Sequence, residues 1–270
     1  MHSGDEIIIV DDASTDDTLS RAETLAENNP SIKIISHNIN KGSAAASRNT
    51  GIDNAKNDLI FCLDSDNILV PNSVHILKEF MLSESASSAV FGKIKYFIND
   101  TKNVTSTATF KDGIISLSDA LAGTMWPGPS GNYLFTKESW LNAKRYNESI
   151  GGAYDSWAFG IQQLATGTKM LTLKDSFYYH RHGYESTFKK ENKKYNPSIT
   201  ALTVLLPYLN LLEDSSIEYI MSKKNRYDWF DNLEKRPLIM KGGVAGTDGK
   251  KVNDDYWYQR IHRKISKLIK

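Results

Sequence analysis

Residues 6–18 read EIIIVDDASTDDT, and this stretch decides the fold class. Its four consecutive β-branched residues predict a short strand with both faces buried, as in a parallel α/β sheet. Two aspartates, Asp11 and Asp12, follow at the carboxyl end of that strand, where open α/β sheets bind their ligands. Ser14 then offers an N-cap for a helix. The stretch therefore indicates a strand–loop–helix unit.

The alternation of strand and helix continues along the chain. A second strand is predicted at 32–36 and a third at 59–63, with a glycine-led loop and helix over 41–55 between them. After Asn196-Pro197 the chain is expected to be helical. Between these parts we expect a helix over 71–82, strands over 89–97, 133–136, 170–173 and 177–180, and helices over 137–143 and 154–165. The pattern is typical of an α/β fold.

Composition excludes several classes of protein. The 270 residues carry 33 basic and 32 acidic side chains, a balance that argues against a nucleic-acid-binding protein. A single cysteine, Cys62, excludes an internal disulfide and a multi-cysteine zinc site. No apolar run approaches the roughly 20 residues that span a bilayer, and the first residues match neither a signal nor a transit peptide. We therefore expect a cytoplasmic protein.

Asp64 and Asp66, at the end of the third strand, point to a metal-bound ligand. Two carboxylates this close repel each other unless a cation or several hydrogen-bond donors neutralise them, and Mg²⁺ or Mn²⁺ with a diphosphate suits such a pair. The sequence has no G-x-x-x-x-G-K-[ST] run and no G-x-G-x-x-G after the first strand, which disfavours P-loop enzymes and dinucleotide oxidoreductases. A turn or N-cap role is the alternative, and for Asp11 it is as compatible with the sequence as ligand binding.

Three segments together resemble the family 2 glycosyltransferases, which have the GT-A fold. Residues 6–18 and the string NKGSAAASRNTGIDNAKNDLIFCLDSDN at 40–67 are similar to the donor-binding half of that family. NESIGGAYDSWAFGIQQLATGTKM at 147–170, followed by YYHRHG at 178–183, is similar to its acceptor-binding half. The resemblance implies a GT-A fold, in which a mixed, Rossmann-like sheet is flanked by helices.

The resemblance also assigns residues to the nucleotide donor. It implies that Asp12, with its neighbour Asp11, contacts the nucleobase and ribose. Lys41 and Arg48 fall where the family places cations near the diphosphate, although both also suit a solvated helix face. Asp64 falls where the family contacts ribose or a metal-bound water.

The metal ligands implied by the resemblance come from two motifs. Asp64 and Asp66 match the family's DxD motif, with Asp66 expected to contact Mn²⁺ or Mg²⁺ directly. His180 matches a histidine that supplies a metal ligand in several GT-A enzymes, and His182 competes with it two residues on. A structural role for a histidine at a strand end is the alternative.

Asp155 matches the position of the family's catalytic base. The family usually has a glutamate before this aspartate, whereas this chain has Tyr154, so a supporting carboxylate is lost while the base is kept. The structural alternative is that Asp155 only caps the helix beginning near Ser156. The nearby glycines, including Gly167, favour the catalytic role.

The resemblance implies a metal-dependent, inverting glycosyltransferase. A nucleotide-sugar donor, expected to be a UDP-sugar, would give its sugar to a hydroxyl of a carbohydrate or lipid-linked acceptor, in polysaccharide or glycoconjugate synthesis. The alternative is a catalytically inactive, GT-A-like binding or scaffold protein. A sugar-nucleotide pyrophosphorylase has a similar sheet, but it normally carries a glycine-rich opening with arginine and lysine that this chain does not show.

Two regions fall outside the family pattern. Family members normally begin with one more strand and helix, so residues 1–195 are expected to form a GT-A domain without that first pair, followed by a helical extension over 196–270. Within the extension, 256–270 predicts a basic helix with a single apolar stripe. Such a helix suits peripheral contact with an anionic membrane and packing on the domain equally well.

Overall fold

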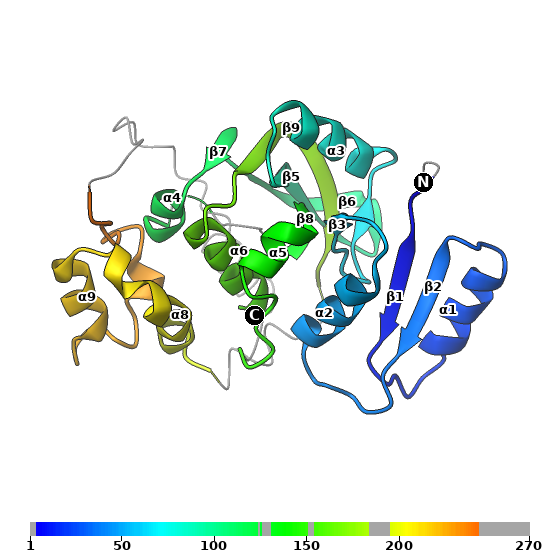
Figure 1. The fold of residues 1–270 in the computed structure, drawn as a ribbon, viewed down its shortest axis with the longest axis horizontal. Helices are drawn as coiled ribbons and strands as arrows, with labels where there is room; N and C mark the ends of the chain where they lie inside the picture. Colours follow the sequence, from blue (N-terminus) through cyan, green and yellow to red (C-terminus); the bar gives the residue numbers. More distant parts are fainter. Residues whose placement is uncertain (1–3, 124, 126–130, 151–153, 184–194, 243–270) are drawn as a thin grey trace.

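A seven-stranded mixed sheet forms the centre of the described chain (Figure 1). The computed structural model describes residues 4–123, 125, 131–150, 154–183 and 195–242. The hydrogen-bonded path of the sheet is β3 (Leu59–Phe61), β8 (Leu134–Thr136), β5 (Ser88–Ile98), β9 (Met170–Arg181) and β4 (Ile68–Leu69). Two further strands are added, β6 (Asp100–Thr109) beside β5 and β7 (Gly113–Ile115) beside β9. The expected α/β class with a mixed sheet is confirmed.

The parallel strands β5 and β9 form the centre of the sheet. The length of β9 differs from the prediction. The sequence predicts two strands where the structure has one, because β9 continues through a register shift next to Gly92. At the shift the two backbones approach so closely that a Cβ on Gly92 would lie 2.2 Å from the carbonyl oxygen of Lys174. Strand β6 is not predicted, because its residues are mostly exposed and polar, and pairing with β5 rather than apolar alternation holds it.

Strands β1 (Ile7–Asp11) and β2 (Ile32–Ser36) form a second, two-stranded parallel sheet. The prediction that β1 is buried on both faces is wrong: only Asp11 is buried, and Ile7 is 39% exposed. The reason is that, in the described residues, β1 pairs with β2 alone. Helix α1 (Thr18–Glu27) starts later than the predicted cap at Ser14, since the Asp11 carboxylate accepts the Ser14 amide and holds a turn there.

Helix α2 (Ala44–Asn54) and one glutamate connect the small sheet to the main one. A Cβ on Gly51 would lie 3.4 Å from Val10, so α2 contacts β1, while Ile52 of the same helix belongs to the main core. At the other end of β1, the Glu6 carboxylate accepts the backbone amides of Lys56 (2.7 Å) and Asn57 (3.0 Å), just before β3. These contacts, not sheet hydrogen bonds, place the start of β1 near the start of β3.

The remaining helices form two groups. Helix α3 (Ser73–Ser83) packs on β5 and β9, and α5 (Lys137–Asn142) packs on β8 and α6. A second core joins α4 (Leu117–Leu121) and α6 (Asp155–Ala165) to the helical segment after residue 195. That segment consists of α8 (Pro197–Leu205), the 3₁₀ turn η2 (Leu206–Leu211), α9 (Asp214–Met221) and the 3₁₀ turn η3 (Phe230–Asn232). Because Trp229 and Trp157 share this core, the helical segment supports α6 rather than forming a detached appendage.

The close approach at Gly92 predicts opposite effects of alanine at two glycines. Gly92→Ala should lower the free energy of unfolding by at least about 2 kcal/mol, because the added methyl group meets backbone that cannot move aside cheaply. Gly51→Ala, inside α2 with ordinary van der Waals space, should be neutral or stabilising by up to about 1 kcal/mol. Urea unfolding of both variants checks this, and equal losses would contradict the role given to Gly92.

Candidate functional site

Asp64 lies at the end of β3, where a second residue fixes it. The Asn132 side chain donates to Asp64 Oδ2 (3.0 Å) and accepts the Asp64 backbone amide (2.8 Å). Asn132 is fully buried, directly before β8, the strand that pairs with β3. This two-point contact sets the direction of the carboxylate. Sequence reasoning did not identify Asn132, since the only signal is one polar residue ahead of an apolar strand.

Arg48 of α2 joins Asp64 to Asp155. Its Nη2 donates to Asp64 Oδ1 at 2.7 Å, and its Nη1 donates both to Asp155 Oδ2 in a short ion pair and to Ser156 Oγ at 3.1 Å. The Arg48 side chain is 13% exposed and that of Asp155 is 8% exposed. Burial works against the charge of the guanidinium, but the two carboxylates outweigh it and raise the pKa of Arg48 well above its ordinary value. Three predicted site residues therefore meet at one point.

Gly131 makes this meeting possible. Its φ is +72°, a left-handed conformation, and a Cβ there would lie 2.6 Å from Ser156 Oγ and 3.1 Å from Arg48 Nη2. A side chain at this position would push the arginine off the carboxylates. The position is a constraint on the site that the sequence alone does not reveal.

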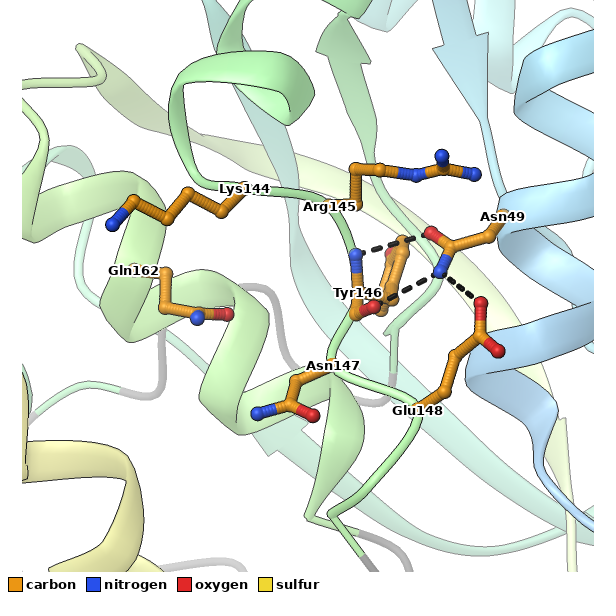
Figure 2. Close-up of a pocket in the computed structure, with 7 residues that line it drawn as sticks. All are labelled: Asn49, Lys144, Arg145, Tyr146, Asn147, Glu148 and Gln162. Atoms are coloured by element: carbon orange, nitrogen blue, oxygen red, sulfur yellow. Dashed lines mark hydrogen bonds between the residues drawn. The ribbon is translucent and has the colours of Figure 1, made fainter.

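Asn49, the neighbour of Arg48 on α2, fixes the loop that leads to α6. Its amide donates to the Tyr146 carbonyl (2.9 Å) and to Glu148 (2.7 Å), and its oxygen accepts the Tyr146 amide and the Trp140 indole (both 3.1 Å). Figure 2 shows Asn49 hydrogen-bonded to Tyr146 and Glu148 of this loop, and these residues line a pocket together with Lys144, Arg145 and Gln162. Two consecutive residues of α2, Arg48 and Asn49, therefore contact the start of α6 and the loop before it.

The carboxylates at the end of β1 are engaged in local contacts. Asp12 accepts His37 Nδ1 (2.6 Å) and the backbone amides of Lys41 (3.0 Å) and Gly42 (3.2 Å). Burial tends to raise the pKa of Asp12, but these hydrogen bonds outweigh it and lower the pKa. Asp11 accepts the Ser14 amide and the Ser36 hydroxyl (3.0 Å), contacts that lower its pKa as well. Asp12 therefore shapes the loop that presents Lys41, and a nucleotide contact for either aspartate stays a prediction.

The residues predicted to bind metal lie near one another, but they do not form a complete site. Asp66 is exposed, and the charges of Asp64 and Asp66 act on His180. Burial outweighs them and lowers the pKa of His180, so the ring is neutral, and its Nδ1 is buried without a hydrogen-bond partner in the described chain. Carboxylate oxygens and a neutral imidazole fit Mn²⁺ chemically. Within the described ranges, however, no three histidine, cysteine or acidic side chains are grouped closely enough to hold a metal.

His182 and the predicted basic helix complete the comparison with expectation. His182 contacts Thr105 of β6 and packs its ring against Tyr96. The charges of Asp64 and Asp66 act on His180, and the choice between the two histidines as a metal ligand stays a prediction. Residues 256–270 lie outside the described residues. Among those described, no helix is long and apolar enough to cross a membrane.

A model of the family "Glycosyl transferase family 2" matches residues 1–141, more than half of the chain. The chain belongs to this family. It is a glycosyltransferase, and the GT-A fold expected from the sequence is confirmed.

Relatives and solved structures agree with this assignment. The chain is 29% identical over 226 residues to the GalNAc(5)-diNAcBac-PP-undecaprenol beta-1,3-glucosyltransferase of Campylobacter jejuni, covering 82% of this chain and 68% of the relative. It is 30% identical over 245 residues to the hyaluronan synthase of Pasteurella multocida, covering 82% of this chain and 23% of the relative. Residues 1–349 of S. aureus TarS in complex with UDP-GlcNAc have a similar fold, with a TM-score of 0.58 at 17% identity, covering 85% of this chain and 61% of that one.

Removal of Asn132 should destabilise the end of β3 and disturb Asp64. Asn132→Ala leaves the partly buried amide of Asp64 without its acceptor, so the free energy of unfolding should fall by about 1–3 kcal/mol. In the donor-binding role predicted for Asp64, affinity for UDP should fall too, because the carboxylate loses its fixed direction. Urea unfolding and calorimetric UDP titration measure both effects, with the exposed Asn142→Ala as control. A variant with unchanged stability would contradict the supporting role of Asn132.

The lowered pKa of Asp11 predicts how stability depends on pH. A carboxylate whose folded pKa lies below its unfolded value of about 3.8 stabilises the fold above that value, and this contribution is lost as the pH falls through the folded pKa. Asp11→Asn should therefore cost about 1 kcal/mol at pH 7, roughly one hydrogen bond, and less at an acid pH below the unfolded value of 3.8, where Asp11 becomes protonated in the folded protein too. Unfolding curves of wild type and variant at both pH values test this. A pH-independent difference would contradict it.

Proposed function

We propose that this glycosyltransferase transfers a sugar from a nucleotide-diphosphate donor, expected to be a UDP-sugar, to an acceptor hydroxyl with inversion. The observation that carries the proposal is the meeting of Asp155 with the donor-side residues Asp64 and Arg48 within one hydrogen-bonded group. A base is thereby held beside the residues assigned to the donor. The bound UDP-GlcNAc of the TarS structure, which shares the fold, is compatible with a uridine donor.

In the proposed mechanism Asp155 is the general base. Oδ2 of Asp155 is held by Arg48, while the side-chain contact of Oδ1 within the described residues is a long one, 3.5 Å to Ser156, so Oδ1 can take the proton of the acceptor hydroxyl. The acceptor oxygen attacks the anomeric carbon from the face opposite the diphosphate. One base and an in-line attack give inversion. A second carboxylate acid, which glycosidases use for their leaving group, is unnecessary for a diphosphate.

Asp64, Asp66 and His180 are the residues that would hold Mn²⁺ or Mg²⁺. Such an ion, when bound, offsets the charge on the departing diphosphate. To coordinate the ion, Asp64 would have to give up part of its hydrogen bonding to Arg48. Asp66 is exposed and has its carboxylate available, which favours it for direct contact.

The acceptor is proposed to be a carbohydrate or a lipid-linked saccharide. The Campylobacter relative is named for a saccharide on PP-undecaprenol, and the Pasteurella relative is a hyaluronan synthase. A lipid-linked acceptor would bring the protein to the cytoplasmic face of a membrane. Residues 256–270 are proposed to add a peripheral contact there.

Asp155→Asn tests the mechanism. Calorimetric binding of UDP with Mn²⁺ should be retained, since the variant keeps the donor-side residues, while sugar transfer should fall by about 10²–10⁴-fold, because general-base catalysis is lost. Transfer is followed as UDP released from a panel of UDP-sugars in the presence of saccharide acceptors. Asp175→Asn, an exposed carboxylate of β9, is the matched control and should keep full activity.

Two outcomes would contradict the proposal. Full turnover by Asp155→Asn would show that Asp155 is not the general base. Wild-type protein that binds no nucleotide sugar, with or without metal, would favour the non-catalytic binding or scaffold protein instead.

A further inference from the structure

We propose that Arg48 is a positioning residue for the base Asp155, and not primarily a ligand of the donor diphosphate. The inference rests on the proposed function, because it assigns a task within the same site. The guanidinium holds one oxygen of Asp155 and leaves the other free for the acceptor proton. It also fixes the distance between the base and Asp64 on the donor side.

The geometry leaves Arg48 little freedom to turn toward a diphosphate. Its two terminal nitrogens are directed to different carboxylates, Asp64 and Asp155, and one of them also contacts Ser156. The guanidinium carbon lies 5.4 Å from the centre of the Tyr146 ring, and Gly131 approaches from another side. A planar fork with separate donors can span two carboxylates in this way, whereas the single ammonium of lysine cannot reproduce the arrangement.

The two carboxylates depend on Arg48 to different degrees. Asp64 keeps two hydrogen bonds to Asn132 without the arginine, and at 29% exposure its carboxylate can also be hydrated. Asp155 is 8% exposed, and its only other side-chain hydrogen bond in the described part of the chain is the 3.5 Å contact with Ser156. A buried carboxylate without its counter-ion changes its position or its protonation state. Loss of Arg48 should therefore disturb the base far more than the donor side.

This asymmetry has a consequence for the reaction. With Oδ2 of Asp155 occupied, the acceptor proton passes to Oδ1 as the acceptor oxygen forms its bond to the anomeric carbon. The bond from that carbon to the diphosphate oxygen breaks, and the diphosphate leaves with the electron pair. Arg48 touches none of the reacting atoms, but it decides which oxygen of the base is available.

The test compares Arg48→Ala and Arg48→Lys with wild type. Binding of UDP in the presence of Mn²⁺ should stay within about threefold, while kcat for UDP release from the active UDP-sugar falls by about 100-fold or more, with little change in the donor KM. Arg48→Lys should recover only a small part of kcat. Guanidine hydrochloride, well below denaturing concentrations, should restore part of the activity of Arg48→Ala, and methylammonium chloride should not. Arg21→Ala, an exposed arginine of α1 paired with Asp17 outside the site, is the matched control.

A double-variant series separates positioning from diphosphate binding. In the Asp155→Asn background, Arg48→Ala should cause no further loss of kcat, because the group that it positions is already removed. The urea concentration at the unfolding midpoint should also be non-additive. The double variant should lower it by less than the sum of the decreases in the two single variants. Additive losses of midpoint and kcat, or a more than tenfold weaker UDP affinity with kcat unchanged, would overturn the inference while leaving the glycosyltransferase mechanism intact. Wild-type protein without UDP binding and UDP release would instead overturn the proposed function.

Discussion

One buried guanidinium holds the two halves of this site together. Arg48 neutralises Asp64, which follows strand β3 in the half predicted to bind the donor, and Asp155, which begins helix α6 in the half predicted to bind the acceptor. Without a cation between them the two carboxylates would repel each other, and the buried carboxylate of Asp155 would carry a large desolvation penalty. The rest of the site follows from this interaction. Gly131 leaves room for it, Asn132 fixes one carboxylate, and Ser156 contacts the arginine beside the other.

The helical segment after residue 195 takes part in the same arrangement from a distance. It packs on α6 through a core that includes Trp157 and Trp229, and the Trp229 indole donates to the Ser198 carbonyl at 3.1 Å. Since Asp155 begins α6, the direction of this proposed base depends on how firmly the helix is packed. Asn49 supplies a second anchor, on the loop before α6. The helical segment after residue 195 and the proposed site are therefore linked through a shared core.

Much of the fold could be predicted because it is encoded locally. Apolar runs bounded by turn residues indicated β2, β3, β5 and α6, and acidic residues at strand ends marked Asp64 as a candidate. Features that depend on contacts between distant parts of the chain could not be predicted in this way. Strand β9 is continuous because Gly92 of the neighbouring strand has no side chain. Strand β6 is stabilised by pairing with β5. Strand β1 is half-exposed because, in the described residues, it pairs with β2 alone. Contacts such as Asn132 with Asp64 join residues 68 positions apart, and no periodicity reveals them.

The attachment of the small sheet has an energetic consequence. No side chain of α1, β1 or β2 belongs to either core cluster, and this unit is joined to the rest through α2 and Glu6. Its backbone amides should exchange with solvent at the low-stability end of the native-state range, below those of β5 and β9. A nucleotide that touched both Asp12 and Asp64 would tie the two sheets together and add its binding free energy to the stability of the weaker one. Donor binding would then act as a thermodynamic cross-link, slowing exchange most strongly in β1 and β2.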